Sequence, residues 1–279
     1  GVDVALFAGG SISKTFAPIA VKAGAVVIDN SSTYRMDPDV PLIVPEVNPQ
    51  DITKHHGIIA NPNCSTIIMV MALKPIYDLA RIKRIIVSTY QAASGAGKDG
   101  LDELENQIKQ AARGEEMTAK IFPSASAKKH FPLALNLVPQ IDIFLDNLYT
   151  KEEMKMVNET KKIFSDPEMR ITATTVRVPV YRSHSESVNV ELEHDVELED
   201  IRKALAGFPG VVLQDDPSQQ IYPMPLYTSG KNDVYVGRLR RDESAANSFN
   251  FWCVGDQIRK GAALNTLQIA ETMVKNGWL

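Results

Sequence analysis

The 279-residue sequence is poor in cysteine, with only Cys64 and Cys253 present. Two cysteines cannot build the disulfide framework of a small secreted protein, and their scarcity fits a reducing cytosol. The sequence also lacks an uninterrupted apolar stretch long enough to span a bilayer, and no charged-then-apolar leader opens it. We therefore expect a cytoplasmic protein with no membrane association.

A long basic run is also missing. The net charge is −4, and the clusters Lys128–His130 and Arg238–Arg241 are too short to form a nucleic-acid surface. The histidines and cysteines do not have the spacing of metal ligands. With 44% apolar and 23% charged residues, the composition is that of an ordinary globular protein. Neither a nucleic acid nor a metal is expected as a partner.

The G-x-G-x-x-G fingerprint of dinucleotide-binding loops is absent as well. Gly1 stands where methionine is expected, and residues 2–8 already have the pattern of a buried strand, which ends at Gly9-Gly10. We therefore expect the chain to begin inside a domain.

Residues 1–63 alternate strand and helix patterns. Strand patterns at 2–8 and 25–29 flank a helical pattern at 13–23, and a short strand is predicted at 42–44. This rhythm is typical of a parallel, doubly wound sheet, in which ligands bind at the carboxyl ends of the strands. The sequence predicts an α/β, Rossmann-like but incomplete nucleotide-binding domain.

Residues 64–257 have longer strands. Strands are predicted at 84–90, 170–181 and 187–194 and near Val211, Val234 and Phe249, with helices at 99–113, 151–164 and 197–207. Consecutive strands with interspersed helices favour an α+β domain with a mixed or largely antiparallel sheet. A last helix at 258–274 is expected to return to the first domain, which residues 258–279 would complete.

Cys64 lies in the most informative stretch, Asn61–Thr66, directly before the apolar run 67–73. The pattern places this cysteine at the start of a helix, where free N–H groups and the dipole favour an anion. Such a position lowers the pKa of a thiol toward neutrality and makes it a nucleophile. The alternative is an inert, buried cysteine.

Four segments together resemble the aspartate-β-semialdehyde dehydrogenase family, over nearly the whole chain. They are Asn61–Thr66, Ser88–Gly97, Arg177–His184 and Gly261–Asn265. The main departure is the missing glycine-rich dinucleotide loop. The resemblance implies that residues 64–257 form a catalytic and dimerisation domain and that the protein is a homodimer.

The implied reaction is the NADPH-dependent reductive dephosphorylation of β-aspartyl phosphate to aspartate β-semialdehyde, in lysine, methionine and threonine biosynthesis. Cys64 would attack the acyl phosphate and form a thioester. His184 would be the acid/base, Arg177 would bind the α-carboxylate of the substrate, and Gln91 would contact and position the substrate.

The resemblance also assigns the remaining contacts. Glu152 would bind the substrate ammonium, although Glu152 and Lys155 also fit an ordinary i,i+3 surface pair. The phosphate would be bound by Lys155, Arg35 and Asn63, and NADP by Ser94, Gly95 and Asn265.

Two other readings stay open. An N-acetyl-γ-glutamyl-phosphate reductase would use the same thioester chemistry, but its motif typically has glycine before the cysteine and needs no ammonium-binding glutamate. Asn63 and Glu152 therefore favour the aspartyl substrate. The second alternative is a non-catalytic oligomerisation module.

Overall fold

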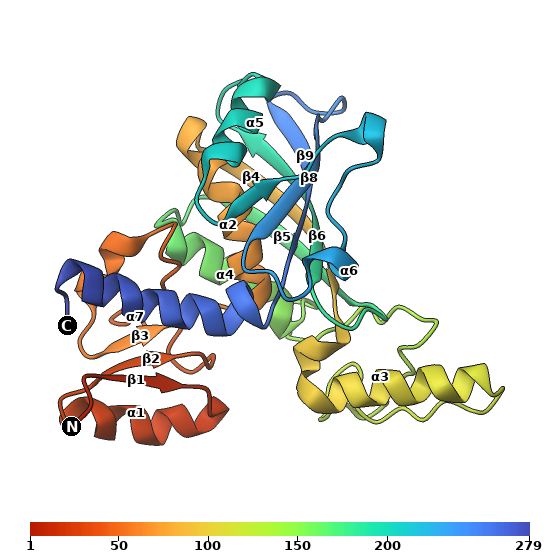
Figure 1. The fold of residues 1–279 in the computed structure, drawn as a ribbon, viewed down its shortest axis with the longest axis horizontal. Helices are drawn as coiled ribbons and strands as arrows, with labels where there is room; N and C mark the ends of the chain where they lie inside the picture. The colour runs from red at the N-terminus through yellow and green to blue at the C-terminus, as the bar shows by residue number, and fades with distance from the viewer.

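The computed structural model describes residues 1–279 and contains two sheets (Figure 1). The first is parallel, with the order β1 (Val4–Phe7), β2 (Val26–Asp29) and β3 (Ile58–Ala60). Helix α1 (Ser13–Lys22) connects β1 to β2. This β-α-β unit is the one that the strand and helix patterns predict.

The C-terminal helix α7 (Leu264–Asn276) packs on the same sheet, although it lies more than 200 positions away in the sequence. In Figure 1 it is the blue helix beside the red N-terminal strands. Its Ile269 and Met273 are fully buried. They form one apolar cluster with Ile28, Ile43, Ile52 and Ile59.

The second sheet has six strands in the order β5-β4-β6-β9-β8-β7. Their bounds are Ile82–Gln91 (β4), Arg170–Arg177 (β5), His184–Leu192 (β6), Val211–Leu213 (β7), Val234–Arg241 (β8) and Ser248–Gly255 (β9). The pairs β4–β5 and β7–β8 are parallel, and the other three are antiparallel. The α/β fold class with a mixed second sheet is thereby confirmed.

The main core joins this sheet to α2 (Cys64–Leu79), α4 (Lys151–Ile163) and α5 (Leu198–Gly207). The apolar run 67–73 of α2 is fully buried, because the helix is surrounded by other elements. Helix α3 (Gly97–Ala112) extends away from the sheet in Figure 1, and the short helix α6 (Pro225–Thr228) lies near β9.

Two elements differ from their predicted form. Residues 42–44 make only an isolated bridge, between Leu42 and Ala60, because Pro41 and Pro45 flank them and cannot donate to a ladder. The C-terminal helix begins with a π-helical turn, Arg259–Ala263, before α7.

The domain boundaries 1–63, 64–257 and 258–279 stay a prediction. None of the helices combines the length and the apolar character needed to cross a bilayer.

Candidate active site

Cys64 is the first residue of α2, as the sequence predicts. The chain leaves β3 at Ala60 and reaches α2 through Asn61-Pro62-Asn63, where Asn63 is the extended N-cap residue. Cys64 as a residue is partly exposed, and its Sγ lies 3.7 Å from Asn63 Oδ1. This turn therefore presents the sulfur at the edge of the helix, where a substrate can reach it.

A cavity of about 350 Å³ lies in front of the thiol. It collects residues from the start of α2, the ends of β4 and β5, and α4. Seven predicted site residues line it: Asn63, Cys64, Gln91, Gly95, Glu152, Lys155 and Arg177. Arg35, Ser94, His184 and Asn265 do not.

Glu152 connects these elements. Its Oε1 accepts from Asn63 Nδ2 at 2.9 Å and from Gln91 Nε2 at 3.2 Å, and its Oε2 from Lys155 Nζ at 3.1 Å. Lys155 Nζ also donates to Asp142 Oδ2 at 3.1 Å. Burial acts to raise the pKa of Glu152, but Lys155 and the donated hydrogen bonds lower it to about 2. The carboxylate is therefore negative at neutral pH.

Arg177 is buried beside the cavity. Its Nη1 donates to the carbonyl of Ala92 at 2.7 Å, and its Nε has no partner within the chain. Gly95 packs against the guanidinium, because a Cβ at this position would lie 2.6 Å from Arg177 Nη1. A buried cation with an unused donor can bind an anionic group of a ligand in the cavity.

His184, the first residue of β6, is completely buried behind the Gly95 loop. Its Nδ1 accepts from the backbone N–H of Ala92 at 3.0 Å, and its Nε2 lies 3.4 Å from Gln91 Nε2. Burial and the nearby Arg177 lower the pKa of His184 to about 3. The imidazole is therefore neutral, and since Nδ1 is an acceptor, its proton is on Nε2.

The charge state of Cys64 differs from the prediction. Burial and the carboxylate of Glu152 raise the pKa of the thiol to about 12, whereas Arg35 and Arg177 act in the opposite direction. The helix N-terminus was expected to lower this pKa, but desolvation and the neighbouring negative charge outweigh its effect. The thiol is therefore protonated at neutral pH in the unliganded site.

Arg35 lies in an adjacent cavity of about 230 Å³, which Lys155 also lines. Its Nε donates to the carbonyl of Asn61 at 2.9 Å and its Nη2 to that of Asn30 at 3.0 Å. Its Nη1 lies 3.2 Å from Glu159 Oε1. Lys155 thus connects the cavity at Cys64 with the cavity that contains the second predicted phosphate ligand.

The predicted cofactor residues separate into two groups. Ser94 and Gly95 belong to the short loop after β4, which borders Arg177 and His184. Asn265, in contrast, is fully buried: its Nδ2 donates to the carbonyl of Ile43 at 3.0 Å and to Asn61 Oδ1 at 2.7 Å. Its amide therefore has no free donor for a cofactor.

Three residues near the site escaped the sequence analysis. Glu159 is buried against Arg35 and Asn63, Gln257 binds Ser94, and Lys260 binds Asn265. Glu159 has a recognisable signal, since it follows Glu152 by seven residues and so lies on the same face of α4. Gln257 and Lys260 have no comparable pattern.

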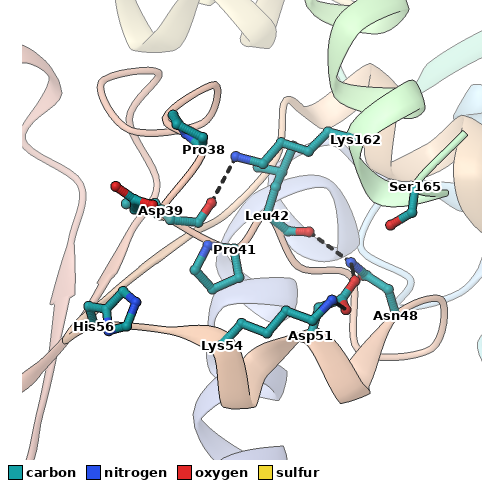
Figure 2. A pocket seen from close by; sticks show the side chains of 11 residues that line it. Pro38, Asp39, Pro41, Leu42, Asn48, Asp51, Lys54, His56, Lys162 and Ser165 are labelled. Atoms are coloured by element: carbon teal, nitrogen blue, oxygen red, sulfur yellow. Dashed lines mark hydrogen bonds and ion pairs between the residues drawn. The ribbon is translucent and has the colours of Figure 1, made fainter. Parts of the chain in front are cut away.

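A further cavity, of about 290 Å³, contains none of the predicted site residues (Figure 2). Its Lys162 donates to the carbonyls of Arg35, Asp37 and Val40 at 2.8, 2.6 and 2.8 Å. The ammonium thus has three protein acceptors, and its contacts fasten the loop after Arg35 to α4.

Comparison with known proteins agrees with this geometry. A family described as "Semialdehyde dehydrogenase, NAD binding domain" matches residues 1–55, and "Semialdehyde dehydrogenase, dimerisation domain" matches residues 73–260. The aspartate-semialdehyde dehydrogenase of Bacillus subtilis is 55% identical over 277 residues, which are 99% of this chain and 80% of the relative. The aspartate-semialdehyde dehydrogenase of Aquifex aeolicus is 53% identical over 280 residues, which are 99% of this chain and 81% of that relative.

Solved structures give the same result. The crystal structure of aspartate semialdehyde dehydrogenase II from Vibrio cholerae has a TM-score of 0.92 at 47% identity and covers 98% of this chain and 80% of that one. The aspartate semialdehyde dehydrogenase of Candida albicans, solved with NADP, has a TM-score of 0.73 at 25% identity. The match covers 97% of this chain and 77% of that one. The resemblance is thereby confirmed: the chain belongs to the aspartate-semialdehyde dehydrogenase family of nicotinamide-dependent oxidoreductases.

Proposed function

We propose that this protein reduces β-aspartyl phosphate to aspartate β-semialdehyde and inorganic phosphate with NADPH, through a thioester on Cys64. The observation that carries the proposal is the cavity in which Cys64 lies together with Arg177 and the Glu152–Lys155 pair. An acyl phosphate with a free amino-acid end needs a nucleophile, a cation for each anionic group and an anion for the ammonium. This set of side chains supplies all three.

The substrate orientation follows from these charges. Arg177 has an unused Nε donor and binds the α-carboxylate, since a guanidinium matches two carboxylate oxygens. Glu152 binds the ammonium, and Lys155 and Arg35 bind the phosphate. An N-acetylated substrate has no ammonium, so the negative Glu152 favours the aspartyl compound over the N-acetylglutamyl one.

In the first step, Cys64 Sγ bonds to the acyl carbon and the C–O bond to phosphate breaks. The thiol starts protonated, and its proton is balanced by release of the phosphate as the hydrogen phosphate ion. Asn63 Nδ2 and Gln91 Nε2, both bonded to Glu152 Oε1, are held in fixed positions beside the reacting carbonyl. The product of this step is the thioester on Cys64.

His184 acts on the oxygen of the reacting carbon. Because the N–H of Ala92 occupies Nδ1, the neutral ring offers an Nε2–H donor that stabilises negative charge on this oxygen. A base role for His184 needs the other tautomer and therefore the loss of the Ala92 contact. The acid/base assignment stays a prediction, with the donor role favoured by this hydrogen bond.

The residues beside the cavity fit a nicotinamide ring at one edge. Gly95 is exposed and has no room for a side chain toward Arg177 and His184, so its backbone can approach a flat ring closely. Ser94 and Gly95 would hold the nicotinamide, whereas Asn265 would act only through its neighbours. When bound, the cofactor supplies the hydride that reduces the thioester; the Candida albicans structure with NADP supports the choice of NADPH.

The product, aspartate β-semialdehyde, places the enzyme in lysine, methionine and threonine biosynthesis. The dimerisation family match supports a homodimer through the second domain. The face of β4, β6 and β9 that carries Tyr90 and Trp252, whose ring centroids are 5.3 Å apart, is the contact surface that we favour. A single monomeric species in analytical sedimentation of the full-length protein would exclude it.

Activity is tested in the reverse, phosphate-dependent direction. The full-length protein should reduce NADP with aspartate semialdehyde and inorganic phosphate, faster than NAD and faster than with N-acetylglutamate semialdehyde. Cys64→Ala should abolish this turnover, while Cys253→Ala, a change at a buried cysteine, should not. Appreciable turnover by Cys64→Ala would exclude the thioester route.

A further inference from the structure

Glu159 is a buried carboxylate that the proposed chemistry does not use. Its side chain is 1% exposed, on the part of α4 that faces the first domain. Oε2 accepts from the backbone N–H of Asn63 at 2.7 Å, and Oε1 accepts from Arg35 Nη1 at 3.2 Å. One carboxylate therefore joins the residue before Cys64 to the arginine of the adjacent cavity.

The hydrogen bond between Arg35 and Glu159 helps to determine which N–H donors of Arg35 remain for a ligand. A guanidinium has five N–H donors. Three have protein partners, namely the carbonyls of Asn61 and Asn30 and the carboxylate of Glu159. One N–H on each terminal nitrogen is left, and Arg35 lines the cavity that it shares with Lys155. Without Glu159, the guanidinium would lose its hydrogen bond to α4.

The contact also fixes the start of α2. Glu152 accepts from the side chain of Asn63, and Glu159 accepts from its backbone N–H. Both carboxylates are on the same face of α4, two turns apart. The N-cap residue beside Cys64 is thus held at two points by one helix.

An amide could not replace this carboxylate. Both oxygens of a carboxylate accept, whereas a glutamine has one acceptor and one donor group. A glutamine at position 159 would point its NH₂ group at a donor, either Asn63 N–H or Arg35 Nη1. The double contact therefore requires an acidic residue.

We propose that Glu159 is a positioning residue that ties the phosphate-binding guanidinium of Arg35 to the backbone immediately before Cys64. Phosphate binding and the placement of the nucleophile are then set by the same carboxylate. The proposal rests on the proposed function for the identity of the anion at Arg35, and on the contacts of Glu159 for the coupling.

The test compares Glu159→Gln with Glu153→Gln in the full-length protein. Glu153 is a matched control, because it is buried on the same helix but accepts from the backbone of Thr150 and Thr175, outside the cavity. In the phosphate-dependent assay, Glu159→Gln should raise the KM for inorganic phosphate about tenfold, a loss of one contact to a charged group. The KM for the aldehyde should stay within about twofold of wild type. A twofold change corresponds to a much smaller free energy than the loss of one hydrogen bond to a charged group.

A second readout does not depend on turnover. Inorganic phosphate should slow alkylation of Cys64 by iodoacetamide in wild type and Glu153→Gln, because an anion near the thiol disfavours the thiolate. In Glu159→Gln the half-maximal phosphate concentration for this effect should rise about tenfold, like the KM. If Glu159→Gln does not fold, Glu159→Asp, whose side chain is one methylene too short to reach both Asn63 N–H and Arg35 Nη1, is used for the same measurements.

An unchanged phosphate dependence in the Glu159 variants, or an equal change in Glu153→Gln, would overturn the coupling. Absence of phosphate-dependent turnover in wild type would instead overturn the proposed function. In that case the alkylation experiment still decides the coupling. A phosphate effect on Cys64 that is weakened only in the Glu159 variants supports it, and absence of this difference refutes it.

Discussion

The side chains around Cys64 achieve their charge states by burial and pairing. Glu152 is the one strongly stabilised anion, whereas the thiol of Cys64 and the imidazole of His184 are both neutral at pH 7. In the proposed reaction, Cys64 would therefore stay in its less reactive thiol form until a substrate binds, since the thiolate is the form that is nucleophilic and easily oxidised.

His184 should make stability depend on pH. Its pKa in the folded protein, about 3, is below its ordinary value of 6.5, so between these values the unfolded chain binds a proton that the folded chain does not. The free energy of unfolding should therefore fall as the pH falls from 6.5, by at most about 1.4 kcal/mol per pH unit for this group. Guanidinium unfolding of wild type and His184→Gln at pH 7 and pH 5 measures this.

The variant cannot titrate at position 184 and should lose less stability between the two pH values. The exposed His194 provides a control, because His194→Gln should follow wild type. Equal pH dependence of wild type and His184→Gln would show that the imidazole is not held neutral.

Glu152 should suppress the reactivity of Cys64. Its carboxylate is one of the causes of the raised pKa of the thiol, so Glu152→Gln should lower that pKa and speed alkylation of Cys64 at pH 8. Below its pKa, a thiol gains about tenfold in thiolate for each unit by which the pKa falls. Mass spectrometry of iodoacetamide-labelled protein gives the rate for Cys64 separately from the buried Cys253, and a slower rate in the variant would contradict this assignment.

The short turn after β4, Ala93–Ala96, has no room for a side chain at Gly95. Gly95 has no positive φ, yet a Cβ there would lie 2.6 Å from Arg177 Nη1 and 3.0 Å from His184 Cε1. A side chain would displace Arg177 from the cavity or His184 from its buried place behind the turn. The glycine is therefore required by close approach and not by backbone conformation.

Gly95→Ala should reduce kcat/KM by about 100-fold, because a displacement of about 1 Å in a reacting site costs this much. Gly95 itself is exposed, so the variant should remain folded. Gly207→Ala, at the end of α5, where a Cβ has open space, is the matched control and should keep full activity. Wild-type kinetics in Gly95→Ala would mean that the loop can move away without cost.

A buried cation fixes the turn by which the chain returns from the second domain to the first. Lys260, in the π-helical turn before α7, is 1% exposed, and its ammonium donates to Glu46, to Asn265 Oδ1 at 3.0 Å and to Gln268 Oε1 at 2.7 Å. Glu46 belongs to the first domain, whereas Gly261 next to Lys260 packs against Cys64, because a Cβ there would lie 3.0 Å from Cys64 Cβ. The turn is therefore held to Glu46 through Lys260 and packs against Cys64 through Gly261.

Lys260→Met should destabilise the protein by about 3–5 kcal/mol, because it leaves Glu46 without its cation in a largely buried site. Chemical unfolding of the full-length protein measures this loss. Lys275→Met, an exposed change on α7, should be within about 0.5 kcal/mol of wild type. If the two variants were equally stable, the Lys260–Glu46 pair would not stabilise the folded protein.

Local patterns in the sequence predict the β-α-β start, the helix at Cys64 and the shared face of Glu152 and Lys155. They do not predict contacts between distant segments. The partners of Glu159, Asn63 and Arg35, are 96 and 124 positions away, and no periodicity connects them. Lysine side chains are ordinarily exposed, so the residue type alone does not predict that Lys260 is buried. The predicted lowering of the Cys64 pKa was wrong. It rested on the position of the residue in its helix, which is local, whereas desolvation of the thiol depends on the whole fold.

The charged stripe of α4 makes the site sensitive to a change of length. Glu152, Lys155, Glu159 and Lys162 succeed one another at intervals of three or four residues, in register with the helical repeat. Inserting one amino acid after Val157 would rotate the distal pair by about 100° while the helix itself persisted. The proposed ligand of the substrate ammonium, Glu152, and the carboxylate at Arg35, Glu159, would then no longer share one face, so tolerated insertions in this protein should cluster outside residues 152–162.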